Sequence, residues 1–215
     1  MSLGYWFTLL KEIIVPRRCA VCGEEIYAGL FCAVCRENFY LEKMLEEQED
    51  INLAYLFYKY QGELRDTIRQ IKFNGQKHYS LKLQEEAELF FSEGWGQFLQ
   101  QYDIIETIPT SRNRVAERGY DIPRLIFAFL PLTKKRVLQR VRETAPLYNL
   151  NQLQREQELA GCFRVTADVA GKRILLADDI FTTGSTAREA ARTLRRAGAK
   201  YVDVIGFTAG KFNWD

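Results

Sequence analysis

Residues 174–186, ILLADDIFTTGST, carry the clearest indication of the fold of this chain. The first four residues are apolar and predict a buried strand, and the alanine pattern that follows it predicts a helix ending at Gly198. The stretch therefore joins a strand to a helix through a short loop. Because ligands of open α/β sheets bind at the carboxyl ends of the strands, this loop is the first candidate for a functional site.

The loop combines two chemical signals. Backbone N–H groups at a helix N-terminus, with hydroxyls and a permissive glycine beside them, favour a phosphate group; the residues are Thr182, Thr183, Gly184, Ser185 and Thr186. Two carboxylates, Asp178 and Asp179, would repel a phosphate but suit the cis-diol of a ribose, or a magnesium ion shared with it. The stretch thus predicts a site for a ribose 5-phosphate. The alternative is a capped helix after two ordinary loop carboxylates.

The rest of the C-terminal part alternates between strand and helix patterns. Strands are predicted at 54–60, 103–108, 134–139, 174–177 and 201–207. Helices are predicted at 64–71, 81–91, 125–130 and 187–197. Strands separated by helices predict an α/β fold, with a parallel sheet flanked by helices. The stretch 140–160 is polar and shows no clear period.

The first part of the chain carries four of the five cysteines in two Cys-x-x-Cys pairs. Cys19 and Cys22 form one pair, and Cys32 and Cys35 form the other. Two such turns bring four thiolates to one metal ion, which predicts a structural zinc site. A reducing compartment disfavours disulfides, and two copies so close together disfavour a thioredoxin-like redox pair. Cys162 stands apart and is expected to be a buried apolar thiol.

These features predict two units. Residues 1–50 would hold an amphipathic helix, the zinc module and an acidic helical connector, and residues 51–215 would form the α/β domain. A module this small has little core of its own, so metal binding is expected to supply much of its folding energy. The stripe of Trp6, Phe7 and Leu10 favours packing of the first helix on the neighbouring domain, and a membrane-surface anchor is the alternative.

Composition places the chain among globular proteins. It has 215 residues, of which 47% are hydrophobic and 27% charged, enough for one sizeable core with a small satellite. No apolar run reaches the ~18 residues that span a bilayer, and the first residues lack a signal-peptide cleavage site. We therefore expect a cytoplasmic protein without a transmembrane segment. His78, the single histidine, is interpreted as a surface residue.

Basic residues gather in the C-terminal half. The segment 112–142 holds nine Lys and Arg residues against Glu117 and Asp121, and the segment 188–200 holds five against Glu189. Such segments favour an anionic partner, and solvated helix faces are the alternative.

The stretch 174–186 resembles the signature of type I phosphoribosyltransferases, which bind 5-phosphoribosyl 1-pyrophosphate (PRPP). A Walker-type loop is excluded because no Gly-Lys-Ser/Thr follows. The chain also resembles the ComF family (competence protein FC and its GntX-like relatives) over nearly its whole length. This resemblance rests on the four cysteines, on YKYQGELRDTIRQIKFNG at 58–75, on Arg118-Gly119-Tyr120 and on Arg140-Val141-Arg142-Glu143-Thr144.

The resemblance implies a type I phosphoribosyltransferase-like parallel sheet behind a four-cysteine zinc module, and PRPP bound with Mg²⁺. By position, Asp178 and Asp179 would be catalytic and would bind the ribose, and residues 182–186 would hold its 5-phosphate. The pyrophosphate would lie on Thr110, Ser111 and Arg112. The stretch 140–160 would be a mobile loop closing over the site, and Arg118, Arg142 and Arg155 would serve this loop or the pyrophosphate.

The chain departs from the family pattern on the pyrophosphate side. Asp121 and Ile122 stand where the family usually has Asn and Gln. Leu147 takes the place of a Gln, and Glu158 takes the place of an Asn.

Two functions follow from the resemblance. One is transfer of a phosphoribosyl group to an acceptor that the sequence does not identify. The other is a non-catalytic protein that senses PRPP or binds single-stranded DNA through its basic surfaces, with Tyr120 and Tyr148 stacking on bases. Both imply a role in DNA uptake during natural transformation or in DNA utilisation, next to a helicase-like partner.

Overall fold

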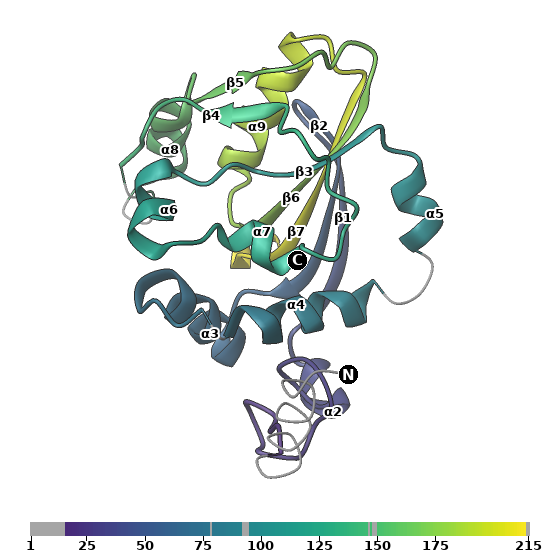
Figure 1. Cartoon of the computed structure of the whole chain (residues 1–215), viewed down its shortest axis with the longest axis vertical. Helices are drawn as coiled ribbons and strands as arrows, with labels where there is room; N and C mark the ends of the chain where they lie inside the picture. Colours follow the sequence, from purple (N-terminus) through teal and green to yellow (C-terminus); the bar gives the residue numbers. More distant parts are fainter. Residues whose placement is uncertain (1–15, 78, 92–94, 146, 148–149, 214–215) are drawn as a thin grey trace, which may run out of the picture.

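The computed structural model describes residues 16–77, 79–91, 95–145, 147 and 150–213. A five-stranded sheet in the order β1-β2-β7-β6-β3 forms its centre (Figure 1). Strands β2, β7, β6 and β3 are parallel, and β1 runs antiparallel to β2 at one edge. The strands are β1 (Tyr40–Gln48), β2 (Ile51–Lys59), β3 (Ile104–Thr107), β6 (Arg173–Phe181) and β7 (Tyr201–Ala209), and a separate antiparallel pair joins β4 (Leu138–Arg140) to β5 (Phe163–Val165).

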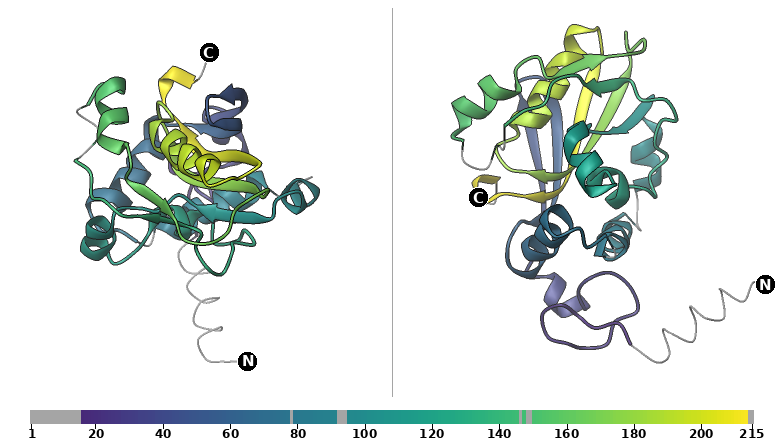
Figure 2. Two further views of the ribbon diagram at one scale, coloured as in Figure 1. Left: turned by 90° about the horizontal axis from the view of Figure 1, so that it is seen from above. Right: turned by 60° about the vertical axis from the view of Figure 1, so that its left-hand side comes forward.

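Helices cover both faces of this sheet. Buried residues of α3, α4 and α7 form one hydrophobic core against it, and those of α9 belong to a second core on the other face. The cysteine-bearing segment lies beyond α3 and α4, away from the sheet (Figures 1 and 2). The helices are α2 (Ala33–Arg36), α3 (Gly62–Phe73), α4 (Tyr79–Phe90), α5 (Trp95–Gln100), α6 (Arg112–Arg118), α7 (Ile122–Ile126), α8 (Gln152–Leu159) and α9 (Ser185–Arg196), followed by the 3₁₀ turn η2 (Lys211–Asn213).

Strand β6 is covered by helices on both faces of the sheet. Ile174 and Leu176 pack into the core with α9, whereas Leu175 and Ala177 pack into the core with α3, α4 and α7. A strand buried on both faces reads as a continuous apolar run, which is the pattern of parallel sheets. The predicted α/β fold with a mostly parallel sheet and flanking helices is confirmed.

Most predicted elements are present at shifted bounds. The strand predicted at 174–177 continues through the acidic pair to Phe181, and the helix expected at 125–130 is α7. The strand expected at 134–139 is reduced to β4.

The prediction of a helical acidic connector is wrong, because this segment is the edge strand β1. Leu41 and Leu45 pack against the core shared with α9, whereas Glu42 and Glu46 are exposed. This two-residue alternation is typical of a strand with one buried face, and the high acidic content masked it. Strand β1 therefore joins residues before position 50 to the sheet of the following domain.

Three sequence interpretations fall outside the described residues: the amphipathic helix with Trp6, Phe7 and Leu10, the surface position of His78, and the stacking role of Tyr148. Among the helices that the structure describes, none combines the length and the apolarity that a bilayer crossing requires. Cys162 is fully buried, as predicted.

Candidate functional site

The acidic pair lies at the carboxyl end of β6, in the middle of the sheet. Asp178 pairs in register with Gly206 of β7. Asp179 is only 6% exposed, its backbone carbonyl accepts a hydrogen bond of 2.9 Å from the Thr208 hydroxyl, and its carboxylate lies 2.6 Å from Nζ of Lys72 on α3. The pair is thus fixed by β7 on one side and by a lysine on the other.

Two adjacent carboxylates at this position share one close lysine. Burial and the neighbouring Asp179 carboxylate raise the pKa of Asp178 well above that of an ordinary Asp, although Lys72 acts to lower it. The site is therefore short of positive charge when both carboxylates are ionised. A divalent cation with oxygen ligands would supply that charge.

The loop after the acidic pair exposes backbone donors. Gly184, the N-cap of α9, has φ +75°, and a Cβ there would lie 2.6 Å from the Phe181 ring. Only glycine fits both the left-handed backbone and this close approach. Within the described part of the chain, the N–H groups of residues 183–186 donate to no protein acceptor. The loop therefore offers several free donors to one anion.

Two guanidinium groups border this loop. Nη1 of Arg188 donates to the Thr183 carbonyl at 2.8 Å, and Nη1 of Arg155 on α8 donates to the Thr182 hydroxyl at 3.2 Å. The hydroxyls of Thr183 and Ser185 lie 2.8 Å apart. Charge, hydroxyls and backbone donors thus meet at the start of α9, which suits a phosphate.

The loop after β3 lies at the same edge of the sheet, because Thr107 pairs with Ala177 in parallel strands. Thr110 donates to the Asp121 carboxylate at 2.9 Å. The Ser111 hydroxyl and the Arg112 N–H, the latter at 2.9 Å, donate to the carboxylate of Glu143. The hydrogen bond from Ser111 lowers the pKa of Glu143. In this conformation, a carboxylate holds the donors predicted to bind pyrophosphate.

The three arginines expected around the pyrophosphate have different surroundings. Burial lowers the pKa of Arg118, and the negative charge of Asp179 acts to raise it. The Arg118 guanidinium is therefore close enough to the acidic pair to interact with it electrostatically. Arg155 reaches Thr182, as described above. Arg142 donates to the carbonyls of Glu158, at 2.5 Å, and Ala160, at 3.0 Å. Its contacts in the described structure run to the end of α8 rather than to the acidic pair.

Sequence reasoning missed Lys72, Glu143 and Arg140. Arg140 is 7% exposed, its Nε has no hydrogen-bond partner among the described atoms, and Asp178 contributes to its electrostatic environment. Lys72 and Arg140 both stand in segments quoted above for the family resemblance, so a signal existed. Spacing alone could not tell which arginine of the Arg140–Arg142 pair turns inward.

The prediction that Tyr120 stacks on bases is contradicted, because its side chain is buried in the core. The side chain is 7% exposed, and its hydroxyl donates to the Ile71 carbonyl at 2.7 Å. It packs between α3 and α7 as part of the core.

The four cysteines of the N-terminal module come together. The Sγ atoms of Cys19, Cys22, Cys32 and Cys35 all lie within 4.8 Å of one another. Partial burial acts to raise the pKa of Cys19, but hydrogen bonds from the backbone at Cys22, Cys32 and Val21 lower it to about 6. Burial and the neighbouring thiols raise the pKa of Cys35 to about 12. Four clustered thiols with one readily ionised member fit a tetrahedral zinc site.

Consecutive glutamates of α4 attach this module to the domain. Glu85 forms an ion pair of 2.6 Å with Arg17. Glu86 is fully buried, forms an ion pair of 2.5 Å with Nε of Arg36, and accepts the Leu30 N–H at 2.9 Å. Charge-assisted hydrogen bonds to these two residues of α4 therefore help to hold the module on the domain.

Comparison with known proteins now adds to this geometry. Residues 128–209, which include the acidic pair and the start of α9, match the model of the phosphoribosyl transferase domain family. The "DNA utilization protein YhgH" of Salmonella typhimurium is 32% identical over 149 residues, which cover 64% of this chain and 63% of that protein. The "Competence protein F" of Haemophilus influenzae is 24% identical over 213 residues, 91% of this chain and 86% of that protein. The chain is a ComF homologue with a phosphoribosyl transferase domain.

The ComF resemblance stated from the sequence is thereby confirmed. A further relative, the "Competence protein ComFC" of Bacillus subtilis, is 27% identical over 153 residues, 70% of this chain and 61% of that protein. The matches span 63% of the Salmonella relative and 49% of the Escherichia coli one. Among solved structures, phosphoribosylpyrophosphate synthetase from Mycobacterium smegmatis aligns over 58% of this ComF homologue and 33% of its own chain, with 24% identity and a TM-score of 0.35.

Proposed function

We propose that this ComF homologue binds PRPP with Mg²⁺ at the carboxyl edge of its sheet. The observation that carries the proposal is the acidic pair near the end of β6, in which Asp179 is buried, followed by the N-terminus of α9 with its free donors. Asp178 and Asp179 would bind the ribose diol and the metal, and residues 182–186 would bind the 5-phosphate. Thr110, Ser111 and Arg112 would bind the pyrophosphate.

The surrounding residues have roles that follow from their contacts. Bound Mg²⁺ would neutralise charge on the pyrophosphate leaving group. Lys72 would hold Asp179 ionised and in position, since the two groups already form an ion pair. Glu143 must leave Ser111 and Arg112 before pyrophosphate can bind there. Arg118, Arg142 and Arg155 would stabilise negative charge on that side once the 140–160 segment closes and excludes water.

Breaking the bond from C1 of the ribose to pyrophosphate develops positive charge on the sugar, and the buried carboxylates would stabilise it. We propose phosphoribosyl transfer to an unidentified acceptor as the activity, with PRPP sensing or single-stranded DNA binding as the alternative. The names of the relatives support a role in DNA utilisation or competence. In such a role, a helicase-like partner would act beside this protein. The exposed side chains of Arg112, Arg124, Lys134 and Lys135 favour the DNA-binding alternative.

The decisive experiment is calorimetric titration of PRPP with Mg²⁺ into the full chain. Asp178→Asn combined with Asp179→Asn removes both metal-binding charges while keeping side-chain size. We expect this double variant to bind PRPP about 100-fold or more weakly than the wild type, a loss of ~2.7 kcal/mol in binding free energy. Asp168→Asn is the matched control, because Asp168 is exposed outside the site, and its affinity should equal that of the wild type.

Equal PRPP affinity in the double variant and the wild type would refute the proposed site. Absence of PRPP binding in the wild type, together with single-stranded DNA binding that falls steeply with salt, would favour the DNA-binding alternative. Release of pyrophosphate that depends on an added base would identify the activity as transfer.

The raised pKa of Asp178 predicts a pH dependence of PRPP affinity. Because protonated Asp178 binds a cation poorly, affinity should fall as the pH drops through this raised pKa, at a higher pH than for an ordinary Asp (pKa ~3.9). Lys72 lowers the pKa of Asp178, so Lys72→Met should move the midpoint of this fall to higher pH. Titrating both proteins with PRPP over the same pH series, downward from pH 8, cancels the ionisation of PRPP itself. An unmoved midpoint would contradict the assignment.

We also propose that Cys19, Cys22, Cys32 and Cys35 hold one structural zinc ion. Their clustered thiols support this proposal. Four thiolates would fill a tetrahedral site and leave no position open for catalysis, so the ion would be structural.

A further inference from the structure

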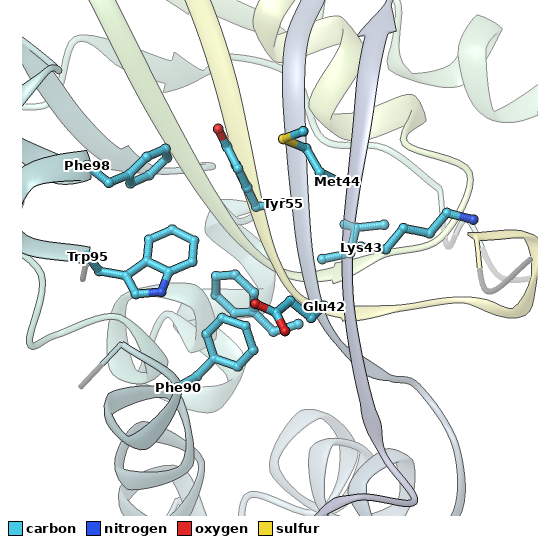
Figure 3. Close-up of a pocket in the computed structure, with 9 residues that line it drawn as sticks. Glu42, Lys43, Met44, Tyr55, Phe90, Trp95 and Phe98 are labelled. Atoms are coloured by element: carbon cyan, nitrogen blue, oxygen red, sulfur yellow. The ribbon is translucent and has the colours of Figure 1, made fainter. Parts of the chain in front are cut away.

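A cavity of about 320 Å³ lies on the sheet face that carries α4 and α5 (Figure 3). Five aromatic rings line it: Tyr55 and Phe57 of β2, Phe90 of α4, and Trp95 and Phe98 of α5. No residue of the acidic pair or of the phosphate loop belongs to its lining. Its size falls at the lower end of the range for small-molecule sites.

The rings are held in fixed relative orientations. The centroids of Trp95 and Phe98 are 4.7 Å apart, and those of Tyr55 and Phe98 are 4.8 Å apart, with ring planes near perpendicular in both pairs. Phe57 stacks on Phe90 at 4.0 Å. Such edge-to-face and stacked pairs are favourable, so the walls keep their shape without a ligand.

Among the described residues that line the cavity, one carboxylate accompanies these rings. Figure 3 shows the Glu42 carboxylate on the side of the rings, whereas the Lys43 ammonium points away from them. The Tyr40 hydroxyl donates to Oε2 of Glu42 at 3.0 Å. Burial and this neighbouring carboxylate raise the pKa of Tyr40, so the hydroxyl remains a donor that orients Glu42.

The backbone of β1 is bent at this point. Glu42 has φ +43°, a left-handed conformation that non-glycine residues rarely adopt. The register between β1 and β2 shifts between Tyr40 and Lys43, which marks a bulge. Bulges commonly redirect a side chain beside a functional site, and here the redirected side chain is the carboxylate at the aromatic cavity.

We propose that this cavity binds a small organic ammonium ion. Aromatic faces attract cations through their quadrupoles, and a carboxylate at the same place adds charge attraction. The described lining combines five rings with one inward charge, so the cation would be recognised by its charge and its apolar substituents together. This site is independent of the proposed PRPP site.

Choline tests the proposal, because it carries a trimethylammonium group, and 3,3-dimethylbutan-1-ol is its neutral isostere. Binding of each to the zinc-loaded full chain would be followed by broadening of the ligand methyl signal in NMR titrations. We expect choline to bind about tenfold or more tightly than the isostere. Glu42→Gln should reduce choline affinity by about tenfold and leave the isostere unchanged, whereas Glu46→Gln, outside the lining, should change neither strongly.

A second variant addresses the rings. Phe98→Leu keeps an apolar wall but removes the quadrupole of one ring. The affinity for choline should therefore fall several-fold, while the affinity for the isostere changes little. Equal binding of choline and its isostere, or unchanged choline affinity in Glu42→Gln, would overturn the proposal and leave an apolar cleft. Failure of choline to bind where adenosine binds would instead assign the cavity to a nucleobase. PRPP affinity, measured in the same variants, should remain that of the wild type.

Discussion

Chelation of zinc from the purified protein is expected to release about one metal ion per chain and to unfold the cysteine module. Structural zinc sites of this kind contribute roughly 10–16 kcal/mol of binding free energy at pH 7, and the four Sγ atoms converge on one point. Without the metal, burial and the neighbouring thiols keep Cys35 protonated, and no thiolate–metal bonds hold the four sulfur atoms together. Hydrogen exchange of residues 16–39 should therefore become fast, and zinc addition should restore protection.

Cysteine variants give the matched comparison. Cys22→Ser should lower the bound zinc to well below one ion per chain, because it removes an exposed ligand without disturbing the core. Cys162→Ala, at the fifth cysteine, should retain the full zinc content. Native protein without metal, or retained protection after chelation, would show that the cysteines serve another purpose.

Glu86→Ala is expected to be the most destabilising single change at the junction of the module with the domain. It would leave the Arg36 guanidinium and the Leu30 N–H without their buried acceptor, and breaking a buried ion pair from one side costs about 3–5 kcal/mol. For a chain of this size, that corresponds to a fall in Tm of about 6–20 °C. Thermal unfolding of the zinc-loaded protein, followed by circular dichroism, measures it.

Glu88→Ala is the control on the same helix. Glu88 is exposed and accepts only a surface hydrogen bond from Gln84 at 2.8 Å, so its loss should change stability by about 0.5 kcal/mol or less. Similar Tm values for the two variants would mean that the buried ion pair at Glu86 contributes nothing net.

Much of the fold could be predicted because its signals are local. Residues 174–186 carry the strand, the turn and the helix start within thirteen positions, and β6 and α9 follow that pattern. The apolar spacing of Leu64, Ile68 and Ile71 likewise predicted α3, which ends beside Asn74. The four cysteines predicted their own cluster because ligand spacing is itself the geometric constraint.

What could not be predicted depends on contacts between distant parts of the chain. Arg36 and Glu86 are fifty positions apart, and nothing in the spacing of either pairs them. Strand β1 is acidic enough to resemble a helix, and it becomes a strand because β2 provides a partner. The inward turn of Arg140 and the Glu143 contact with Ser111 depend on how the 140–160 segment folds back. The assigned roles of the site residues remain predictions for the experiments above.

The parallel pairing of β2 with β7 also constrains how the protein is made. Ala54 lies opposite Val204, 150 positions later, so β2 has no partner on that side until nearly the whole chain has been synthesised. At 5–20 residues per second, the delay is about 8–30 s. During translation the β1–β2 hairpin exposes an apolar edge, and strands in that state are prone to aggregate. A premature stop before residue 201 would leave the sheet without its central strand.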